Sequence, residues 1–114
     1  MNASEWQRFY TQVRDANRDP KSGDQVIETL MATYARQPAA DKAEINQVLS
    51  EDLESDDSLT RYDAHLVISM FEISTALPAL ERVASRLAGS RSVPERGEAE
   101  TIRATIARLR GTGD

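Results

Sequence analysis

The segment 59–73, LTRYDAHLVISMFEI, is the most apolar run of helical length in the chain and constrains the fold more than any other feature. Its apolar side chains recur at spacings of three and four residues, which predicts an amphipathic α-helix. This stripe consists of Leu59, Tyr62, Leu66, Met70 and Ile73. Val67, Ile68 and Phe71 widen it until little of the helix surface is polar. Such a helix must be covered on more than one side, so we expect it at the centre of the fold.

Five further segments show the same helical periodicity. The expected helices span residues 5–17, 24–36 and 40–53, a segment capped by Thr75 and closed by Gly89, and residues 98–110. No run alternates apolar and polar residues without also fitting a helix, so no strand is expected. The predicted fold class is therefore all-α, with about six antiparallel helices in a single domain spanning residues 1–114. Two arrangements remain open, a stack of helical hairpins and a closed helical bundle.

Local signals indicate where several of these helices begin. Ser4 and Gln7 have the spacing of a capping box, and Asp57 or Ser58 is placed to cap the central helix. We expect residues 90–98, SRSVPERGE, to form a loop or a ragged helix start before the last helix.

Composition limits the class of protein and its compartment. Apolar residues make up 39% of the chain and charged residues 29%, which is typical of a folded soluble domain. The absence of cysteine excludes disulfides, thiolate nucleophiles and thiolate metal sites. No apolar run approaches the roughly 18 residues of a membrane-spanning helix, and the N-terminal residues lack the pattern of a secretory signal. We therefore expect a cytoplasmic protein that binds no membrane.

The net charge of −5 is concentrated in about one fifth of the chain. Residues 41–63 carry eight acidic and two basic side chains, whereas residues 1–40 are balanced and residues 64–114 have one excess basic side chain. A field of this sign repels nucleic acid and anionic membranes and attracts a basic partner.

The block 53–87 contains an acidic turn, an arginine and an alanine on the helix that follows, and a proline that opens the next helix. These residues are Asp56, Asp57, Arg61, Ala64 and Pro78. In this order they resemble a HEAT-like helical repeat, although the preceding pair of helices lacks both the arginine and the well-placed proline. The resemblance implies stacked helical hairpins that present a surface to other macromolecules.

A short, acidic, cysteine-free chain with about two and a half such hairpins also resembles the small bacterial immunity proteins. That resemblance implies a protein-binding module that neutralises a cognate toxin, of the basic nuclease type, by covering it with an acidic face. The alternative is a HEAT-like adaptor or scaffold domain without an inhibitory role. Neither function implies a cofactor.

We expect the partner-binding surface at the acidic turn and at the helix ends beside it. The candidate residues are Glu51, Asp52, Glu54, Asp56, Asp63, Tyr34 and Tyr62. Carboxylates steer and pair with lysines and arginines of a basic partner, and tyrosines are frequent interface anchors. In the alternative interpretation the acidic residues form a solvated helix end, in which Asp57 caps the next helix, and the tyrosines belong to the core.

No residue pattern indicates catalysis or a metal site, so we expect a protein that is not an enzyme. His65 is the only histidine, and its position in mid-helix favours a packed or partly exposed residue over a general base. The acidic segment fits a calcium loop poorly, because the sixth position is Asp57 instead of glycine and the twelfth is Asp63 instead of glutamate.

Seven arginines follow residue 80 and suggest a basic face on the last two helices. Glutamates interrupt this face and no aromatic residues interleave for base stacking. We therefore expect a solvated surface with local ion pairs, such as Glu98 with Arg103, and no binding of nucleic acid.

Overall fold

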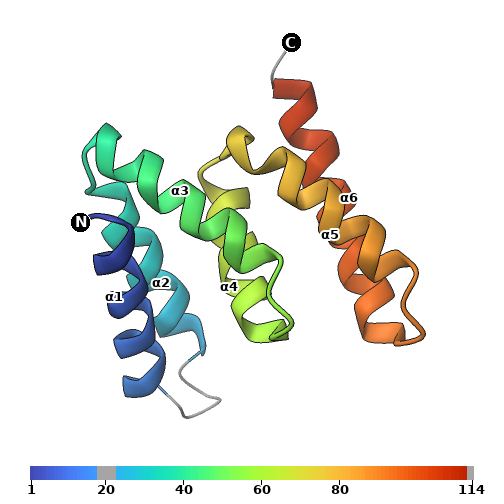
Figure 1. Ribbon diagram of the computed structural model, residues 1–114, viewed down its shortest axis with the longest axis horizontal. Coiled ribbons are helices and arrows are strands. Elements are labelled where there is room, and N and C mark those ends of the chain that lie inside the picture. The colour runs from blue at the N-terminus through green and yellow to red at the C-terminus, as the bar shows by residue number, and fades with distance from the viewer. Residues whose placement is uncertain (18–22, 113–114) are drawn as a thin grey trace. The chain divides into compact units, whose positions relative to one another are not determined.

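A computed structural model of the chain describes residues 1–17 and 23–112, and in these ranges it contains α-helices, one short 3-10 helix and no strand (Figure 1). The elements are α1 (Ala3–Ala16), α2 (Gly23–Ala35), α3 (Ala39–Leu53), α4 (Ser58–Met70), η2 (Ser74–Ala76), α5 (Leu77–Ala88) and α6 (Val93–Thr112). The all-α class and the expected number of helices are thereby confirmed.

The chain divides into two compact units, Met1–Val48 and Leu49–Asp114, with the boundary inside α3. The organisation of residues 1–114 as one domain, and their stacking as HEAT-like hairpins, stay predictions.

In the unit Met1–Val48 the core is built around Trp6, which is buried on α1. Its ring meets those of Phe9 and Tyr34 edge to face, with centroids 5.5 and 6.4 Å apart. The Tyr34 hydroxyl donates a hydrogen bond to Asn46 Oδ1 at 2.7 Å, so the polar end of this buried ring is satisfied. The aliphatic part of this core consists of Val26, Leu30, Ile45 and Val48.

The start of α1 differs from the predicted capping box. Asn2 is the cap, because its side-chain oxygen accepts from the Glu5 N–H and the Glu5 carboxylate accepts from the Asn2 N–H, both at 2.9 Å. The same reciprocal pattern that was expected of Ser4 and Gln7 therefore occurs two residues earlier, where a carboxylate also meets the positive end of the helix dipole.

In the unit Leu49–Asp114, α5 runs antiparallel to α4, because Arg86 near the end of α5 reaches Asp56 just before α4 begins. α6 then returns beside α5 (Figure 1). Three hydrogen-bonded pairs join α4 to α6, and they occur in the same order along both helices. These pairs are Arg61–Glu98, His65–Thr105 and Ser69–Arg108. α4 and α6 therefore lie side by side and run parallel, and α5 runs antiparallel to both. The buried apolar residues between these helices include Val67, Ile68, Leu80, Val83, Leu87, Ile102, Ile106 and Leu109.

The buried face of α4 agrees only in part with the predicted apolar surface: Val67 and Ile68 are buried as expected, but three residues of the stripe are not. Leu59, Tyr62 and Met70 are 56%, 55% and 61% exposed, although Ile73 is buried as expected. The residues that α4 buries are Arg61, Asp63, Ala64, His65, Val67 and Ile68. Polar side chains can be buried when they find hydrogen-bond partners, and α6 supplies partners for Arg61 and His65. Leu59, Tyr62 and Met70 are consequently turned outward.

Two helix ends also differ from prediction. α4 stops at Met70 because Glu72 adopts a left-handed backbone conformation (φ 51°), and the Ile73 N–H then bonds back to the Ile68 carbonyl. Asp57 caps the start of α4, as expected, by accepting from the Thr60 N–H. Thr75 does not cap α5, which begins after η2 without a side-chain cap.

α6 begins at Val93, so most of the segment 90–98 is helical instead of loop. The Ser92 hydroxyl accepts from the Glu95 N–H at 3.4 Å, and the Ser92 carbonyl accepts from the Arg96 N–H. Ser92-Val-Pro-Glu95 therefore acts as a helix start, with the proline in the first turn where its missing N–H costs no helical bond.

Candidate partner-binding groove between α4 and α6

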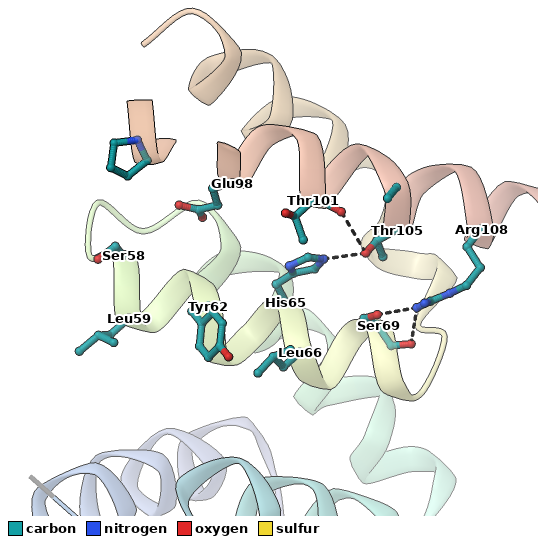
Figure 2. Close-up of a pocket in the computed structure, with 12 residues that line it drawn as sticks. Ser58, Leu59, Tyr62, His65, Leu66, Ser69, Glu98, Thr101, Thr105 and Arg108 are labelled. Atoms are coloured by element: carbon teal, nitrogen blue, oxygen red, sulfur yellow. Dashed lines mark hydrogen bonds between the residues drawn. The ribbon is translucent and has the colours of Figure 1, made fainter. Parts of the chain in front are cut away.

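A groove of about 640 Å³ runs between α4 and α6 and lies wholly within the unit Leu49–Asp114 (Figure 2). One wall comes from successive turns of α4 and the other from successive turns of α6. The α4 wall consists of Ser58, Leu59, Tyr62, His65, Leu66 and Ser69, and the α6 wall of Pro94, Glu98, Thr101, Ala104, Thr105 and Arg108. Two of the exposed apolar residues of α4, Leu59 and Tyr62, therefore border a hollow and not a flat surface.

The floor of the groove holds the pair His65 and Thr105, which face each other from the two helices (Figure 2). His65 Nε2 lies 2.7 Å from the Thr105 hydroxyl, which also donates a longer bond to the Thr101 carbonyl at 3.5 Å. Burial lowers the pKa of His65 below its ordinary value. The packed histidine expected from the sequence is confirmed.

At the end where both helices begin, the buried guanidinium of Arg61 is surrounded by acceptors. Its Nε and Nη2 donate to the Glu98 carboxylate at 2.9 and 3.0 Å, and Nη1 donates to the Ser55 carbonyl at 3.0 Å. Glu95 approaches the same guanidinium at 3.7 Å. Two carboxylates thus share one cation, which leaves one negative charge at this end. The hydrogen bonds with Glu98 raise the pKa of Arg61 above its ordinary value.

At the opposite end Arg108 lies across the groove from α4 (Figure 2). Its Nη2 donates to the backbone carbonyl of Ser69 at 2.7 Å and to the Ser69 hydroxyl. Arg108 is exposed and lines the groove. The two ends of the groove therefore carry charges of opposite sign.

The acidic candidates from the turn between α3 and α4 occupy different environments. Glu54 receives two hydrogen bonds from Arg82, at 2.7 and 3.1 Å, which lower the pKa of its carboxyl. Asp56 lies 3.4 Å from Arg86. Glu51 is exposed and forms no ion pair within the described part of the chain. The acidic turn is therefore partly neutralised by α5.

The other candidates divide between surface and core. Tyr62 is exposed in the groove, whereas Tyr34 and Asp63 are 4% and 2% exposed, so neither presents surface to a partner. For Tyr34 the core interpretation is the correct one. Asp52 is half-buried, and this burial, followed by the charges of Glu51 and Asp63, raises the pKa of its carboxyl to about 6.

Replacing Asp52 by asparagine will raise the free energy of unfolding at neutral and basic pH. Because the folded-state pKa of about 6 lies above the ordinary 3.8, the folded protein binds this proton more tightly than the unfolded chain. Stability therefore falls as pH rises through that interval. This difference in pKa corresponds to a change of about 3 kcal/mol in the free energy of unfolding. Screening by water reduces it to about 1–2 kcal/mol for this partly exposed side chain. Urea denaturation at about pH 8 should show the gain and at about pH 4 little of it; equal gains would contradict the assignment.

The arginines of α5 and α6 mostly bond to residues far away in the sequence and not in the local pairs that were expected. Arg82 and Arg86 bond to the acidic turn, Arg110 to Glu81, and Arg96 to the Ser90 carbonyl. The specific pair predicted between Glu98 and Arg103 is wrong, because Glu98 turns inward to Arg61.

Sequence reasoning missed the groove residues contributed by α6, namely Thr101, Ala104, Thr105 and Arg108. With Pro94 and Glu98 they recur at spacings of three and four residues, which is a detectable helical face. That face is mostly small or polar, so it carries no hydrophobic signal.

Comparison of the chain with family models, with curated proteins and with solved structures gives no match. Within the described residues no helix has the length and apolarity needed to cross a membrane. No group of three or more His, Asp or Glu side chains in those residues is arranged to hold a metal ion.

Proposed function

We propose that this chain is a non-catalytic protein-binding module and that it binds its partner with the groove between α4 and α6. The observation that carries the proposal is the pair of large apolar side chains, Leu59 and Tyr62, that stay more than half exposed beside a hollow of about 640 Å³. Exposed apolar side chains that border a concave surface are typical of interaction sites, and tyrosine is enriched among residues that dominate binding energy.

As its biological role we propose inhibition of a basic toxin domain in the cytoplasm, as an immunity-type protein. The net charge of −5 and the exposed carboxylate of Glu51 support attraction of a basic partner. The paired carboxylates of Glu54 and Asp56 contribute less to that attraction, because Arg82 and Arg86 compensate them. The acidic turn therefore steers the partner in this proposal, and the groove supplies the contact area.

The test is affinity capture from the native cell with three forms of the protein. Wild type and the control Arg103→Ala should retain the same partner, whereas Tyr62→Ala should lose most of it, since truncating a central tyrosine weakens binding by about thirtyfold or more. Arg103 is exposed on α6 and lies outside the groove. Equal capture by all three forms would place the interface elsewhere.

The inhibitory role is tested with the captured partner. Expression of that partner alone should arrest growth, and co-expression of wild type, but not of Tyr62→Ala, should restore it. A partner that is harmless alone would favour the adaptor or scaffold function over immunity.

A further inference from the structure

We infer that the groove binds an amphipathic α-helix of the partner. This helix carries an acidic side chain at one end and a basic side chain at the other. This inference rests on the proposed function and adds the chemistry of the bound element. Its first support is the length of the groove. The walls run from Ser58 to Ser69 on α4 and from Pro94 to Arg108 on α6. At 1.5 Å per residue these walls are about 16 and 21 Å long, which matches a helix of about 12 to 14 residues.

The second support is the backbone chemistry of the walls. Both walls are α-helices, so between their first and last turns the N–H and C=O groups are bonded within the helix. An extended segment laid between them would bury its own backbone groups without partners, which is costly. A helix satisfies its own backbone and needs only an apolar face, for which Leu59, Tyr62 and Leu66 offer contacts at successive turns.

The third support is the charge at the two ends. Glu95 and Glu98 together outweigh Arg61 by one negative charge where the helices begin, and Arg108 is exposed about three turns further along α6. The ligand that complements both ends carries a lysine or arginine near Glu95 and Glu98 and a glutamate or aspartate near Arg108. A bound helix with only one kind of charge would meet repulsion at one end.

The experiment uses the full chain and a designed peptide as probe. The peptide is a stapled, fluorescein-labelled helix of about 14 residues, since unstapled helices of this length are marginal in water. It has leucines at i, i+3, i+4 and i+7 spacing, one glutamate in the first turn and one lysine in the last. A second peptide carries lysine at both ends. Fluorescence anisotropy should show micromolar binding of the first peptide to wild type and about fivefold weaker binding of the second.

The charge swap decides the inference. Arg108→Glu should reverse the preference, so that the peptide with two lysines binds more tightly, whereas Arg103→Glu on the other face of α6 should leave the preference as in wild type. Circular dichroism checks that both variants fold. Equal binding of the two peptides to wild type, or an unchanged preference in Arg108→Glu, would overturn the inference.

Other occupants of the groove give distinct results. Binding of decanoic acid without binding of either peptide would indicate a small apolar ligand, and dimerisation in light scattering that Tyr62→Ala abolishes would indicate a second copy of the chain. Either result would overturn the helix inference. The proposed function would survive peptide failure if Tyr62→Ala still loses the captured partner, so the two failures are distinguishable.

Discussion

Replacing Arg61 by alanine should lower the free energy of unfolding by about 3 kcal/mol, because removing one partner of a buried ion pair leaves the other uncompensated. The Arg61 side chain is only 3% exposed, and it bonds Glu98 twice and the Ser55 carbonyl once. Without the guanidinium, the Glu98 carboxylate loses both of these bonds, and the Ser55 carbonyl keeps only the longer bond from Arg86 at 3.4 Å. Urea denaturation followed by circular dichroism measures the change.

Arg82 provides the matched control for this prediction. It also forms a two-bond pair with a glutamate, Glu54, but both side chains of this pair are exposed to water. Exposed pairs contribute little, so Arg82→Ala should leave the unfolding midpoint nearly unchanged. If the two substitutions destabilise the protein equally, burial is not what makes the Arg61 network important.

The Arg61→Ala variant also tests the single-domain prediction. Trp6 is the only tryptophan and lies in the unit Met1–Val48, whereas Arg61 lies in the other unit. In one cooperative domain, the tryptophan fluorescence and circular dichroism transitions shift together. A fluorescence transition that stays at its wild-type midpoint would show that the two units unfold independently.

Replacing Trp6 by alanine should lower the free energy of unfolding by about 3–5 kcal/mol, as is usual when a large buried aromatic side chain is truncated. Its ring is 1% exposed and contacts the rings of Phe9 and Tyr34, so the substitution removes both edge-to-face contacts and leaves a cavity. Urea denaturation followed by circular dichroism measures it, with Gln7→Ala, an exposed neighbour on α1, as the control. A loss below about 1 kcal/mol would mean that the ring is not at the core of its unit.

Helical periodicity was sufficient to predict the class of fold and the approximate position of each helix. The apolar residues of α6, which recur at helical spacing, are also buried, namely Ala99, Ile102, Ile106 and Leu109. On that helix the apolar residues form one stripe and the opposite face is polar, so the direction of the core is unambiguous.

On α4 the same method was right for Val67, Ile68 and Ile73 and wrong for Leu59, Tyr62 and Met70, and the reason is physical. Arg61 and His65 are buried because Glu98 and Thr105, 37 and 40 residues away in the sequence, accept or share their hydrogen bonds. Periodicity predicts that polar residues such as Arg61 and His65 are exposed, because it contains no information on partners that are distant in the sequence. The groove exists because Leu59 and Tyr62 of α4 are exposed, so it could not be predicted from periodicity. Tyr62 is the only candidate site residue that lines it.

The acidic turn could be recognised in the sequence as a run of charged residues, but the arginines that compensate its negative charge could not. Arg82 and Arg86 reach Glu54 and Asp56 from a helix that lies 28 and 30 residues further along the chain. A charge run therefore located a real feature of the surface and overstated the number of carboxylates open to a partner. Glu51, Glu54, Asp56 and Tyr62 are exposed as expected, but Glu54 and Asp56 are paired with arginines.

Thiol labelling tests the claim that the groove is the partner-binding surface most directly, because the chain has no cysteine of its own. Ala104→Cys places a single thiol in the groove wall, and Ala107→Cys places one on the same helix outside the groove, with both positions exposed. Addition of the captured partner should slow maleimide labelling at position 104 by about tenfold or more and leave position 107 unchanged. Equal labelling rates at position 104 with and without a partner that is demonstrably bound would contradict the account.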